Sequence, residues 1–470
     1  MTSTNREGGS TIGSGVINLT NTIVGAGMLG LPGAMGSTGW LSGILIIVIS
    51  AAFSAHGLVL LSKAACLTGR PSSFYSVALA SVPRFTILID AAVALKCFGV
   101  ATGYLVTISS SMVKAMEYLL QSPDPADDDR YEYFNSLLLS RQIWVIGAMM
   151  AALPFSFYRT LDDLKKASAL ALIFVFVLVW VIIAYANGGA NPCENDDDDE
   201  LTCRGDVVPF TNFASTVSRL PIFVFAFTCH HNIFPIVNEM ELLSQRRLNI
   251  VISCSIGFAL VIYSIVALEG YQTYGSLVRG DILLNYPENM PVTVLRICIA
   301  FMLTLHYPLQ LDPGRRCISS LVKVVLRWCH QKKSNRRNLS EYFCNPELER
   351  QESDESIEEE QSDGVYAPME MSHGRNPQEE CDDRIFYSIT ILFLALSFLL
   401  ATIVDDLGVI LALVGATGST LVSYVLPGLM YIKVYPNKDA SLVMAHVQLL
   451  LGIVIMPLAL YFIVTEKLSH

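Results

Sequence analysis

The sequence predicts an all-α membrane protein with eleven transmembrane helices. Of its 470 residues 52% are apolar and only 16% are charged, whereas soluble domains usually carry about 25% charged residues. The apolar residues form long runs, and eleven of these runs have the roughly 20 residues that a helix needs to cross a bilayer. Composition and hydropathy together therefore indicate a polytopic membrane protein.

One long polar segment interrupts the series of apolar runs. The chain divides into an N-terminal tail (1–12), spans one to eight (13–314), an insert (315–383) and spans nine to eleven (384–470). The insert is polar and acid-rich, so we expect it to be disordered, because it cannot bury enough apolar surface to fold alone. It is either a solvated spacer or a binding site for a cytoplasmic regulator. The expected spans cover 13–35, 40–66, 84–112, 141–159, 164–187, 216–239, 248–274, 292–313, 384–404, 407–432 and 441–465.

Lysine and arginine set the expected orientation, because they accumulate in cytoplasmic loops. With the N-terminus in the cytoplasm, about 22 of them lie on the inner side and about 8 on the outer side. The outer loops are acidic instead, for example at 127–129 and 196–200. We therefore expect the N-terminus and the insert in the cytoplasm, and the C-terminus outside or in a lumen.

Charge and cysteine content argue against a nucleic-acid-binding protein and against a fold held together by disulfides. The net charge of −11 arises in the loops and the insert, so we expect no nucleic-acid partner. The 11 cysteines are scattered mostly through apolar segments, which is not the pattern of a disulfide framework. Cys193 and Cys203 share one outer loop whose length lets their Cα atoms come within about 7 Å. We expect them to form a disulfide in an oxidising outer compartment.

The first span contains an apolar stretch that disfavours a continuous helix. Within Thr22–Pro32 it holds Gly25, Gly27 and Gly30, and then Pro32. Glycine costs a helix interior about 1 kcal/mol and proline about 3 kcal/mol. In lipid, backbone groups that a break releases are tolerated only where they line a cavity or meet a partner. We interpret the stretch as a broken helix and a candidate binding site; close helix packing through small residues is the alternative.

The same glycines also spell G-x-G-x-x-G, the fingerprint of dinucleotide-binding proteins. That fingerprint requires a preceding strand and an acidic residue about 20 positions later. Here the later segment is Ile46–Ile49, so we reject the match. We expect no cofactor apart from a coupling ion, Na+ or H+.

The sixth span is interrupted in a similar way. Polar groups within a span indicate function by default, although a local hydrogen-bonded cap on a kinked helix is the alternative. Broken spans one and six are expected when spans one to five and six to ten form inverted repeats, with span eleven as an addition. The polar residues inside Leu220–Glu239 are Thr228, His230, His231 and Asn232, and Pro235 follows them.

A broken helix can hold both charged ends of an amino acid. The N–H groups and the positive dipole at the start of its second half attract a carboxylate. The carbonyls that end its first half suit a cation or an ammonium group. The residues expected to bind substrate through their backbone are Gly25, Ala26, Gly27 and Met28 for the carboxylate, and Ala226, Phe227 and Thr228 for the amine.

Several stretches carry a resemblance to a known family. They are Asn18–Pro32, Leu153–Ser156, Ala226–Asn232, Gly270–Tyr271, His306–Leu309 and Leu413–Thr420. In these stretches, which occur in the same order, the chain resembles the amino acid/auxin permease superfamily. It looks most similar to sodium-coupled neutral amino-acid transporters and to fungal vacuolar amino-acid transporters.

The resemblance implies secondary active transport of amino acids by an eleven-helix, LeuT-like fold with a 5+5 inverted repeat. In the sodium-coupled branch an asparagine in helix one and a threonine in helix eight are linked to cation coupling, and the matching positions are Asn21 and Thr304. The vacuolar branch resembles proton-driven carriers. There His230, His231 and His306 are candidates, because histidine titrates near neutral pH; a structural role for each is the alternative.

Two ionisable residues lie in or near apolar spans, namely Lys96 and Glu269. Each is expected to belong to an internal ion pair or a proton path. A snorkelling side chain or a buried structural pair is the alternative.

Two functions from different classes follow. The first is a secondary transporter that moves an amino acid with Na+ or H+, and the second is an amino-acid sensor that signals through the 315–383 insert. We see no ring of pore-lining charges typical of a channel, and no nucleophile or metal constellation typical of an enzyme. The expected partners are membrane lipid and a small-molecule amino acid, in the plasma membrane or a vacuolar or lysosomal membrane.

Overall fold

A computed structural model describes the fold of residues 10–120, 135–157, 165–187, 204–344, 377–435 and 440–469. Every secondary-structure element in this part of the chain is a helix. The single β-type contact there is an isolated bridge between Ser10 and Met240. The expected disulfide between Cys193 and Cys203 lies outside the described residues. The all-α class is thus confirmed for the described chain.

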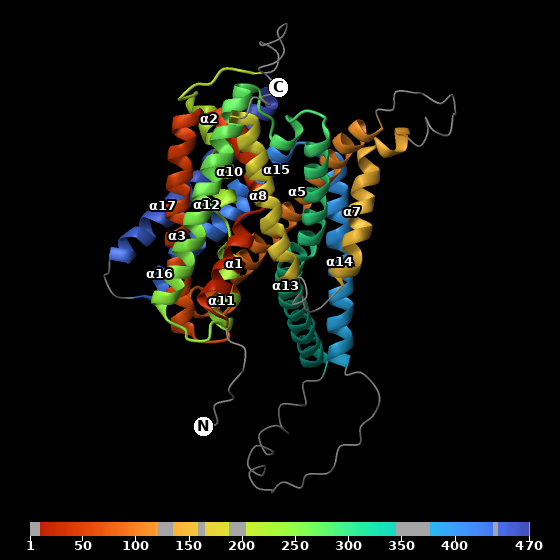
Figure 1. Ribbon diagram of the computed structural model, residues 1–470. Coiled ribbons are helices and arrows are strands. Elements are labelled where there is room, and N and C mark those ends of the chain that lie inside the picture. Colours follow the sequence, from red (N-terminus) through yellow and green to blue (C-terminus); the bar gives the residue numbers. More distant parts are fainter. Residues whose placement is uncertain are drawn as a thin grey trace.

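The helices follow the expected order along the chain (Figure 1). Those of the first half are α1 (Ile12–Ile23), η1 (Ala26–Gly30), α2 (Leu31–Thr38), α3 (Trp40–Thr68), α4 (Phe74–Ser81), η2 (Pro83–Phe85), α5 (Thr86–Leu119), α7 (Arg141–Ser156) and α8 (Lys165–Asn187). Those of the second half are α10 (Phe213–Ala226), η4 (His230–Asn232), α11 (Ile233–Glu239), α12 (Gln245–Tyr274), η5 (Gly275–Leu277), η6 (Ile282–Leu284), α13 (Met290–Cys344), α14 (Pro377–Ile403), α15 (Leu407–Val414), η8 (Gly415–Ser419), η9 (Leu421–Val425), α16 (Leu426–Val434) and α17 (Ala440–Ser469).

Eight helical segments of the described chain are long and apolar enough to cross a membrane. A ninth consists of the pair Ile12–Ile23 and Gly27–Thr38, which meet at a bend of 45°. The predicted fourth and fifth spans coincide with α7, which has 16 residues, and with α8, whose apolar part is Leu172–Asn187. The chain is therefore a multi-pass membrane protein.

The eighth span does not end where the sequence predicts. We expect it to end at 314, but α13 continues to Cys344, and its membrane-length part reaches Leu326. Arg315 and Arg316 suggest a polar loop, yet both form ion pairs within the helix to Asp312, at 2.8 and 2.9 Å. Because these charges are paired one turn away, they do not interrupt the helix. The beginning of the insert expected to be disordered is therefore helical.

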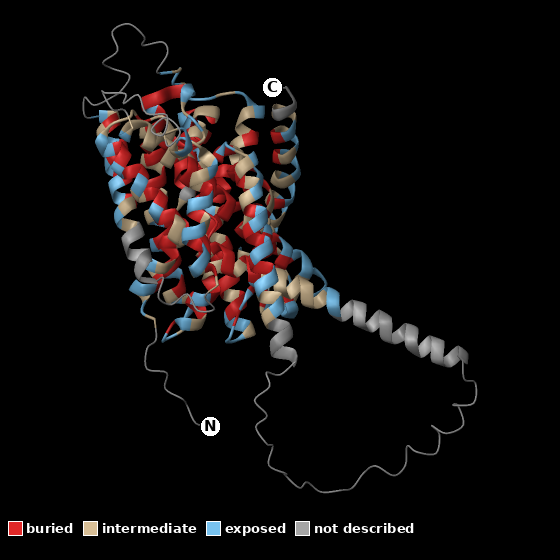
Figure 2. Ribbon diagram, turned by 90° about the vertical axis from the view of Figure 1, so that its right-hand side faces the viewer, coloured by how far each residue is buried: buried red, intermediate tan, exposed pale blue. Residues whose placement is uncertain are grey.

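The long helices form two groups that lie on opposite sides of the bundle in Figure 1. In one group α12 packs against α1, α2 and α3, and α10 packs against α2 and α3. In the other, α5, α7, α13 and α14 all contact one another. Buried residues fill the middle of the bundle and exposed ones lie on its flanks (Figure 2). The apolar stretch of Phe213–Glu239 is 78% buried, whereas that of Ala440–Glu466 is only 22% buried.

Candidate functional site

The first span is broken between α1 and η1. Val24 has an extended backbone, and Gly25 follows with φ −144° and ψ −153°. A β-carbon built on Gly27 would lie 3.1 Å from Phe225 Cε1 and 3.2 Å from Ala226 Cα. Glycine at this position therefore lets η1 approach the end of α10 closely.

The second break separates α10 from η4 and α11. After Ala226 the backbone turns, and the Thr228 N–H donates to the Phe225 carbonyl at 2.9 Å. The Thr228 hydroxyl donates to the Val224 carbonyl at 2.8 Å, and the Ser54 hydroxyl of α3 donates to the Phe227 carbonyl at 2.7 Å. Side-chain hydroxyls thus donate hydrogen bonds to carbonyls near the break. Such bonds are needed because no water is present in the membrane core to serve these carbonyls.

A single tyrosine joins the two breaks. Tyr263 of α12 is fully buried, and its hydroxyl lies 2.5 Å from the Ile23 carbonyl and 3.1 Å from the Ala226 carbonyl. These are the last residues of α1 and α10, so one donor serves the end of both half-helices. A second link is the hydrogen bond from the Asn232 amide to the Thr22 hydroxyl. The structure therefore brings the two predicted breaks into one site.

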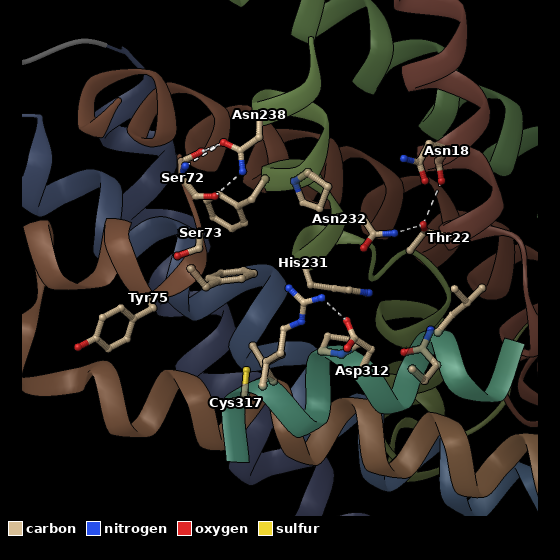
Figure 3. A pocket seen from close by; sticks show the side chains of 18 of the residues that line it. Asn18, Thr22, Ser72, Ser73, Tyr75, His231, Asn232, Asn238, Asp312 and Cys317 are labelled. Atoms are coloured by element: carbon tan, nitrogen blue, oxygen red, sulfur yellow. Dashed lines mark hydrogen bonds and ion pairs between the residues drawn. The ribbon is translucent and has the colours of Figure 1, made fainter. Parts of the chain in front are cut away.

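A cavity of about 770 Å³ lies beside the two breaks, with Thr22 on one side and His231 and Asn232 on the other (Figure 3). Neither Tyr263 nor any of the seven residues predicted to bind substrate is among its lining residues. Asn18, Asn21 and Thr22 line it from α1. His306 and Gln310 line it from α13 on another wall. Its size is that of a small-molecule site with polar groups on its walls. The remaining lining residues include Ser72, Tyr75, Asp90, Tyr104, His231, Asn232, Asn238, Glu239, Asp312, Arg316, Cys317 and Ser320.

The two predicted cation ligands lie in different surroundings. Asn21 is buried in the cavity wall, and neither its amide nitrogen nor its oxygen has a hydrogen-bond partner among the described residues. Thr304 is half-buried and donates to the Ala300 carbonyl of its own helix at 2.8 Å. No described hydrogen bond joins the two residues. Each can offer an oxygen to a cation: the Asn21 side-chain oxygen has no partner among the described residues, and the Thr304 hydroxyl keeps its lone pairs while it donates to Ala300.

The three candidate histidines do not form one cluster. His231 and His306 line the cavity, and the Nδ1 atom of His306 lies 2.8 Å from the Met302 carbonyl. His230 is fully buried elsewhere, beside α3 and α17: a β-carbon built on Gly57 would lie 2.7 Å from His230 Nε2 and 2.6 Å from Gln448 Nε2. His230 is thus packed among helices with neither ring nitrogen hydrogen-bonded among the described residues, whereas the other two histidines line the cavity.

The opposite end of the bundle is closed by packed loops. The fully buried guanidinium of Arg296 donates to the Leu283 carbonyl at 2.9 and 3.2 Å and to the Tyr286 carbonyl at 2.7 Å. These bonds hold the 278–286 loop on α13. A β-carbon built on Gly33 of α2 would lie 2.5 Å from the Arg279 carbonyl oxygen.

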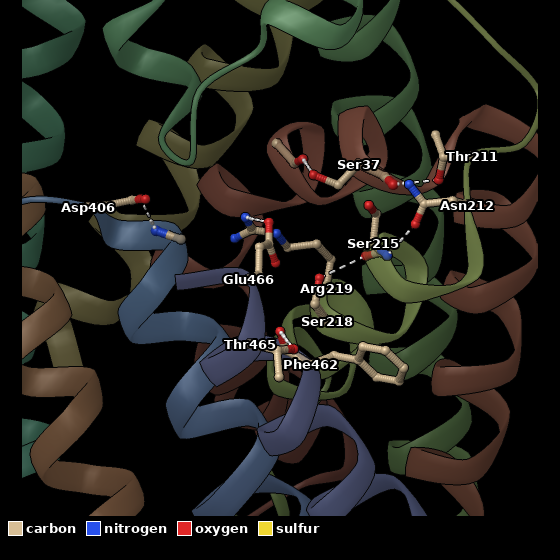
Figure 4. A network of polar contacts seen from close by, with 12 residues as sticks. Ser37, Thr211, Asn212, Ser215, Ser218, Arg219, Asp406, Phe462, Thr465 and Glu466 are labelled. Carbon is tan, nitrogen blue, oxygen red and sulfur yellow. Dashed lines mark hydrogen bonds and ion pairs between the residues drawn. The ribbon is translucent and has the colours of Figure 1, made fainter. Parts of the chain in front are cut away.

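Polar contacts extend this closure across the neighbouring helices (Figure 4). Arg219 of α10 forms an ion pair with Glu466 of α17 at 3.0 Å. The Thr211 hydroxyl donates to the Ser37 carbonyl of α2 at 2.5 Å. These contacts pack the described helix ends together at the end of the bundle opposite the start of α1.

We predict that acidic pH stabilises this closed end through Asp281. Burial raises the pKa of Asp281 to about 7, with a further rise from Asp406 and opposing effects of the Leu283 N–H and Arg296. The Asp281 Oδ2 atom has no partner among the described residues. A raised pKa favours the neutral acid in the packed loop, so packing is strongest below the ordinary pKa near 4 and weakens as the pH rises toward about 7.

The measurement is the labelling rate of a cysteine placed at Leu283, which is buried in the loop. With a membrane-impermeant thiol reagent, the labelling rate of this cysteine is expected to rise several-fold from about pH 5 to about pH 8. In the Asp281→Asn variant, the cysteine at position 283 should be labelled at a rate that does not depend on pH, after correction for the pH dependence of the reagent itself. A pH response that survives in Asp281→Asn would contradict the assignment.

The sequence does not predict the roles of Tyr263 and Ser54, which hold backbone carbonyls at the breaks, or of Arg296, which holds carbonyls at the opposite end of the bundle. Their partners lie far away along the chain or in an irregular loop. Arg296 alone carries a signal, because an arginine near the start of an apolar span needs partners.

Comparison with known proteins identifies the family of the chain. A family model described as "Transmembrane amino acid transporter protein" matches residues 8–469. "Vacuolar amino acid transporter 5" of Schizosaccharomyces pombe is 32% identical over 435 residues, which are 91% of this chain and 85% of that protein. "Vacuolar amino acid transporter 6" of Saccharomyces cerevisiae is 29% identical over 452 residues, 92% of each. "Sodium-coupled neutral amino acid symporter 2" of Danio rerio is 26% identical over 338 residues, 67% of this chain and 64% of that protein.

Proposed function

Because the chain belongs to the transmembrane amino acid transporter family, we propose that it is a secondary active transporter that couples amino-acid movement to Na+ or H+ by alternating access. The family consists of transporters rather than enzymes. The observation that carries the proposal is that Tyr263 joins two broken helices, while Thr22 and Asn232 of the same two spans line a cavity of about 770 Å³. Broken helices that meet near the middle of the membrane form the substrate sites of such transporters.

In this proposal the two breaks bind the two charged ends of an amino acid. Gly25, Ala26, Gly27 and Met28 form the start of the second half-helix, and their backbone attracts the carboxylate. The Met28 N–H already donates to the Gly25 carbonyl at 3.2 Å, so the first three N–H groups are the available donors. The carbonyls of Ala226, Phe227 and Thr228 attract the amine. Ala226 and Phe227 already accept bonds from Tyr263 and Ser54. Each carbonyl oxygen has a second lone pair, so both can still receive the ammonium group.

The helix contacts support a LeuT-like arrangement with eleven spans. Counting α7 and α8 as spans four and five, one packed group contains spans one, two, six and seven, and the other contains three, four, eight and nine. Each group therefore contains two spans from the first five and the two spans at the same positions among the next five. That is the pattern expected when two inverted repeats interlock, with one bundle moving against the other around the site.

We place the N-terminus in the cytoplasm on the distribution of lysine and arginine. The cavity then opens to the cytoplasm, and the loops around Arg296 close the outer side, which is an inward-facing arrangement. The 315–383 segment lies on the cytoplasmic side, where a regulator has access to it. The membrane is vacuolar, lysosomal or the plasma membrane, in keeping with the names of the relatives.

Flux through purified protein in proteoliposomes tests the function. A panel of labelled amino acids is offered with a Na+ gradient, with a pH gradient and with neither. Uptake that one gradient drives above the passive level supports the transporter. Binding of an amino acid without flux under any gradient would instead favour the sensor.

The cation site gives a second prediction. If Na+ is the coupling ion, Asn21→Ala and Thr304→Ala are each expected to weaken Na+ dependence by about tenfold or more, because each removes one oxygen ligand. Uptake is measured against Na+ concentration at fixed pH. Thr402→Ala is the control, since Thr402 is an exposed residue that donates to Leu399 within its own helix. Unchanged Na+ dependence in Thr304→Ala would remove that residue from the mechanism.

A further inference from the structure

Lys96 is a buried cation with too few partners. It lies in the span Pro83–Leu119, and only 4% of its surface is exposed. Its Nζ atom donates to Gln310 Oε1 at 3.4 Å, and no carboxylate of the described residues forms an ion pair with it. An ammonium group has three N–H donors and no acceptor. One long bond to a neutral amide leaves most of its desolvation cost uncompensated.

The position of Lys96 connects it with the proposed substrate site. Val93 and Tyr104, which lie on the same face of α5, line the cavity together with Gln310. The Tyr104 hydroxyl would lie 3.7 Å from a β-carbon built on Gly25, so this face reaches the first break. Lys96 itself is not among the lining residues; its ammonium group reaches the lining through the bond to Gln310 of α13.

The neighbouring helix leaves room for the lysine. A β-carbon built on Gly418 would lie 2.9 Å from both the backbone nitrogen and the Cβ atom of Lys96. Gly418 belongs to η8, a π-helical turn, and such turns are frequent at functional sites. A side chain at 418 would displace this part of α5. The fold therefore accommodates a buried lysine whose charge no described carboxylate neutralises.

We propose that Lys96 is the specificity-determining residue and that its ammonium group binds the side-chain carboxylate of an acidic amino acid. The inference rests on the proposed function, in which the breaks bind the main-chain carboxylate and amine. The substrate side chain then points toward α5 and α13, where Lys96 and Gln310 supply hydrogen-bond donors. A second carboxylate completes the missing ion pair, whereas a cationic side chain meets repulsion.

The acidic residues of the cavity do not oppose this assignment. Asp312 forms ion pairs with Arg315 at 2.8 Å and with Arg316 at 2.9 Å, so its charge is compensated. The Asp90 carboxyl makes hydrogen bonds to Ser320 and Cys317 on α13. Asp90 lies nearly two helical turns from Lys96 along α5, and Glu239, the third acidic residue of the lining, is the last residue of α11.

The experiment is competition for uptake in proteoliposomes containing the full chain. Unlabelled glutamate and aspartate are compared, as competitors of uptake, with glutamine and asparagine, which have nearly the same shape without the charge. Lysine and arginine are tested in the same way. We expect the acids to compete at least about tenfold better than the amides in the wild type, and the basic amino acids to compete worst. Lys96→Met should abolish the preference for acid over amide, and Lys96→Arg should retain it.

Lys63→Met is the matched control, because Lys63 of α3 donates to Ser441 away from the cavity. It should keep the wild-type order of competitors. Should Lys96→Met fail to fold, the wild-type order and Lys96→Arg still decide the question. The inference is wrong if the wild type takes up neutral amino acids and glutamate does not compete, or if folded Lys96→Met keeps the wild-type order of competitors. Either result leaves the proposed transport function intact. Absence of all flux would instead refute the proposed function itself.

Discussion

Replacing Tyr263 by phenylalanine is expected to reduce transport by about ten- to a hundredfold. The substitution keeps the ring, which packs against Phe227 with centroids 5.0 Å apart, and removes only the hydroxyl. The Ile23 and Ala226 carbonyls then lose the donor that holds the ends of α1 and α10 together. Leaving a buried acceptor unpaired costs about 1–3 kcal/mol, and 1.4 kcal/mol is tenfold in an equilibrium.

The measurement is the initial rate of amino-acid uptake as a function of substrate concentration. Tyr307→Phe is the control: its hydroxyl is also buried and pairs with Ser397 at 2.5 Å, but that bond joins α13 to α14 away from both breaks. The control is expected to lower thermal stability by a similar amount and to leave the Michaelis constant unchanged. Equal uptake by Tyr263→Phe and the wild type would show that the bridge has no part in binding or in alternating access.

The breaks themselves could be predicted from sequence because their causes are local. Gly25, Gly27 and Pro32 disfavour a helix wherever they occur within a few residues of one another. The polar stretch from Thr228 to Asn232 likewise interrupts an apolar span. Both breaks lie where the sequence places them, after Ile23 and after Ala226.

The contacts between the breaks could not be predicted, because they join residues far apart in the chain. Tyr263 is 240 residues from Ile23 and 37 from Ala226. Its immediate neighbours, Ile262 and Ser264, do not indicate that this tyrosine joins the two breaks. The same limitation applies to the histidines: residue type made all three candidates for proton coupling, and only the structure shows that His230 packs at Gly57 while His231 lines the cavity.

Charge patterns were reliable for the class of protein and less so for helix ends. Arg315 and Arg316 look like the beginning of a loop when they are read singly. Asp312, three and four residues earlier, pairs with both and lets the helix continue. Such pairing depends on helical spacing, so the end of a span cannot be deduced from the first charged residue.

Replacing Gly33 by alanine is expected to open the closed end of the bundle. The new β-carbon would lie 2.5 Å from the Arg279 carbonyl oxygen and 3.1 Å from the Gly280 Cα atom, both of which are backbone. The loop must move away from α2, although Arg296 holds it on α13. Overpacking of this kind costs about 1–3 kcal/mol, which corresponds to a shift of about five- to a hundredfold between closed and open states.

The measurement is labelling of a cysteine at Leu283 by an impermeant thiol reagent, at a pH where Asp281 is neutral. Gly257→Ala is the matched control, because a β-carbon there meets nothing within 4 Å. Both substitutions add a methyl group to a helix and gain up to about 1 kcal/mol in helix propensity, so their difference isolates the contact with the loop. Faster labelling in Gly33→Ala alone, together with slower uptake, is the expected result. Equal labelling in the two variants would mean that the loop moves freely and does not close the outer side.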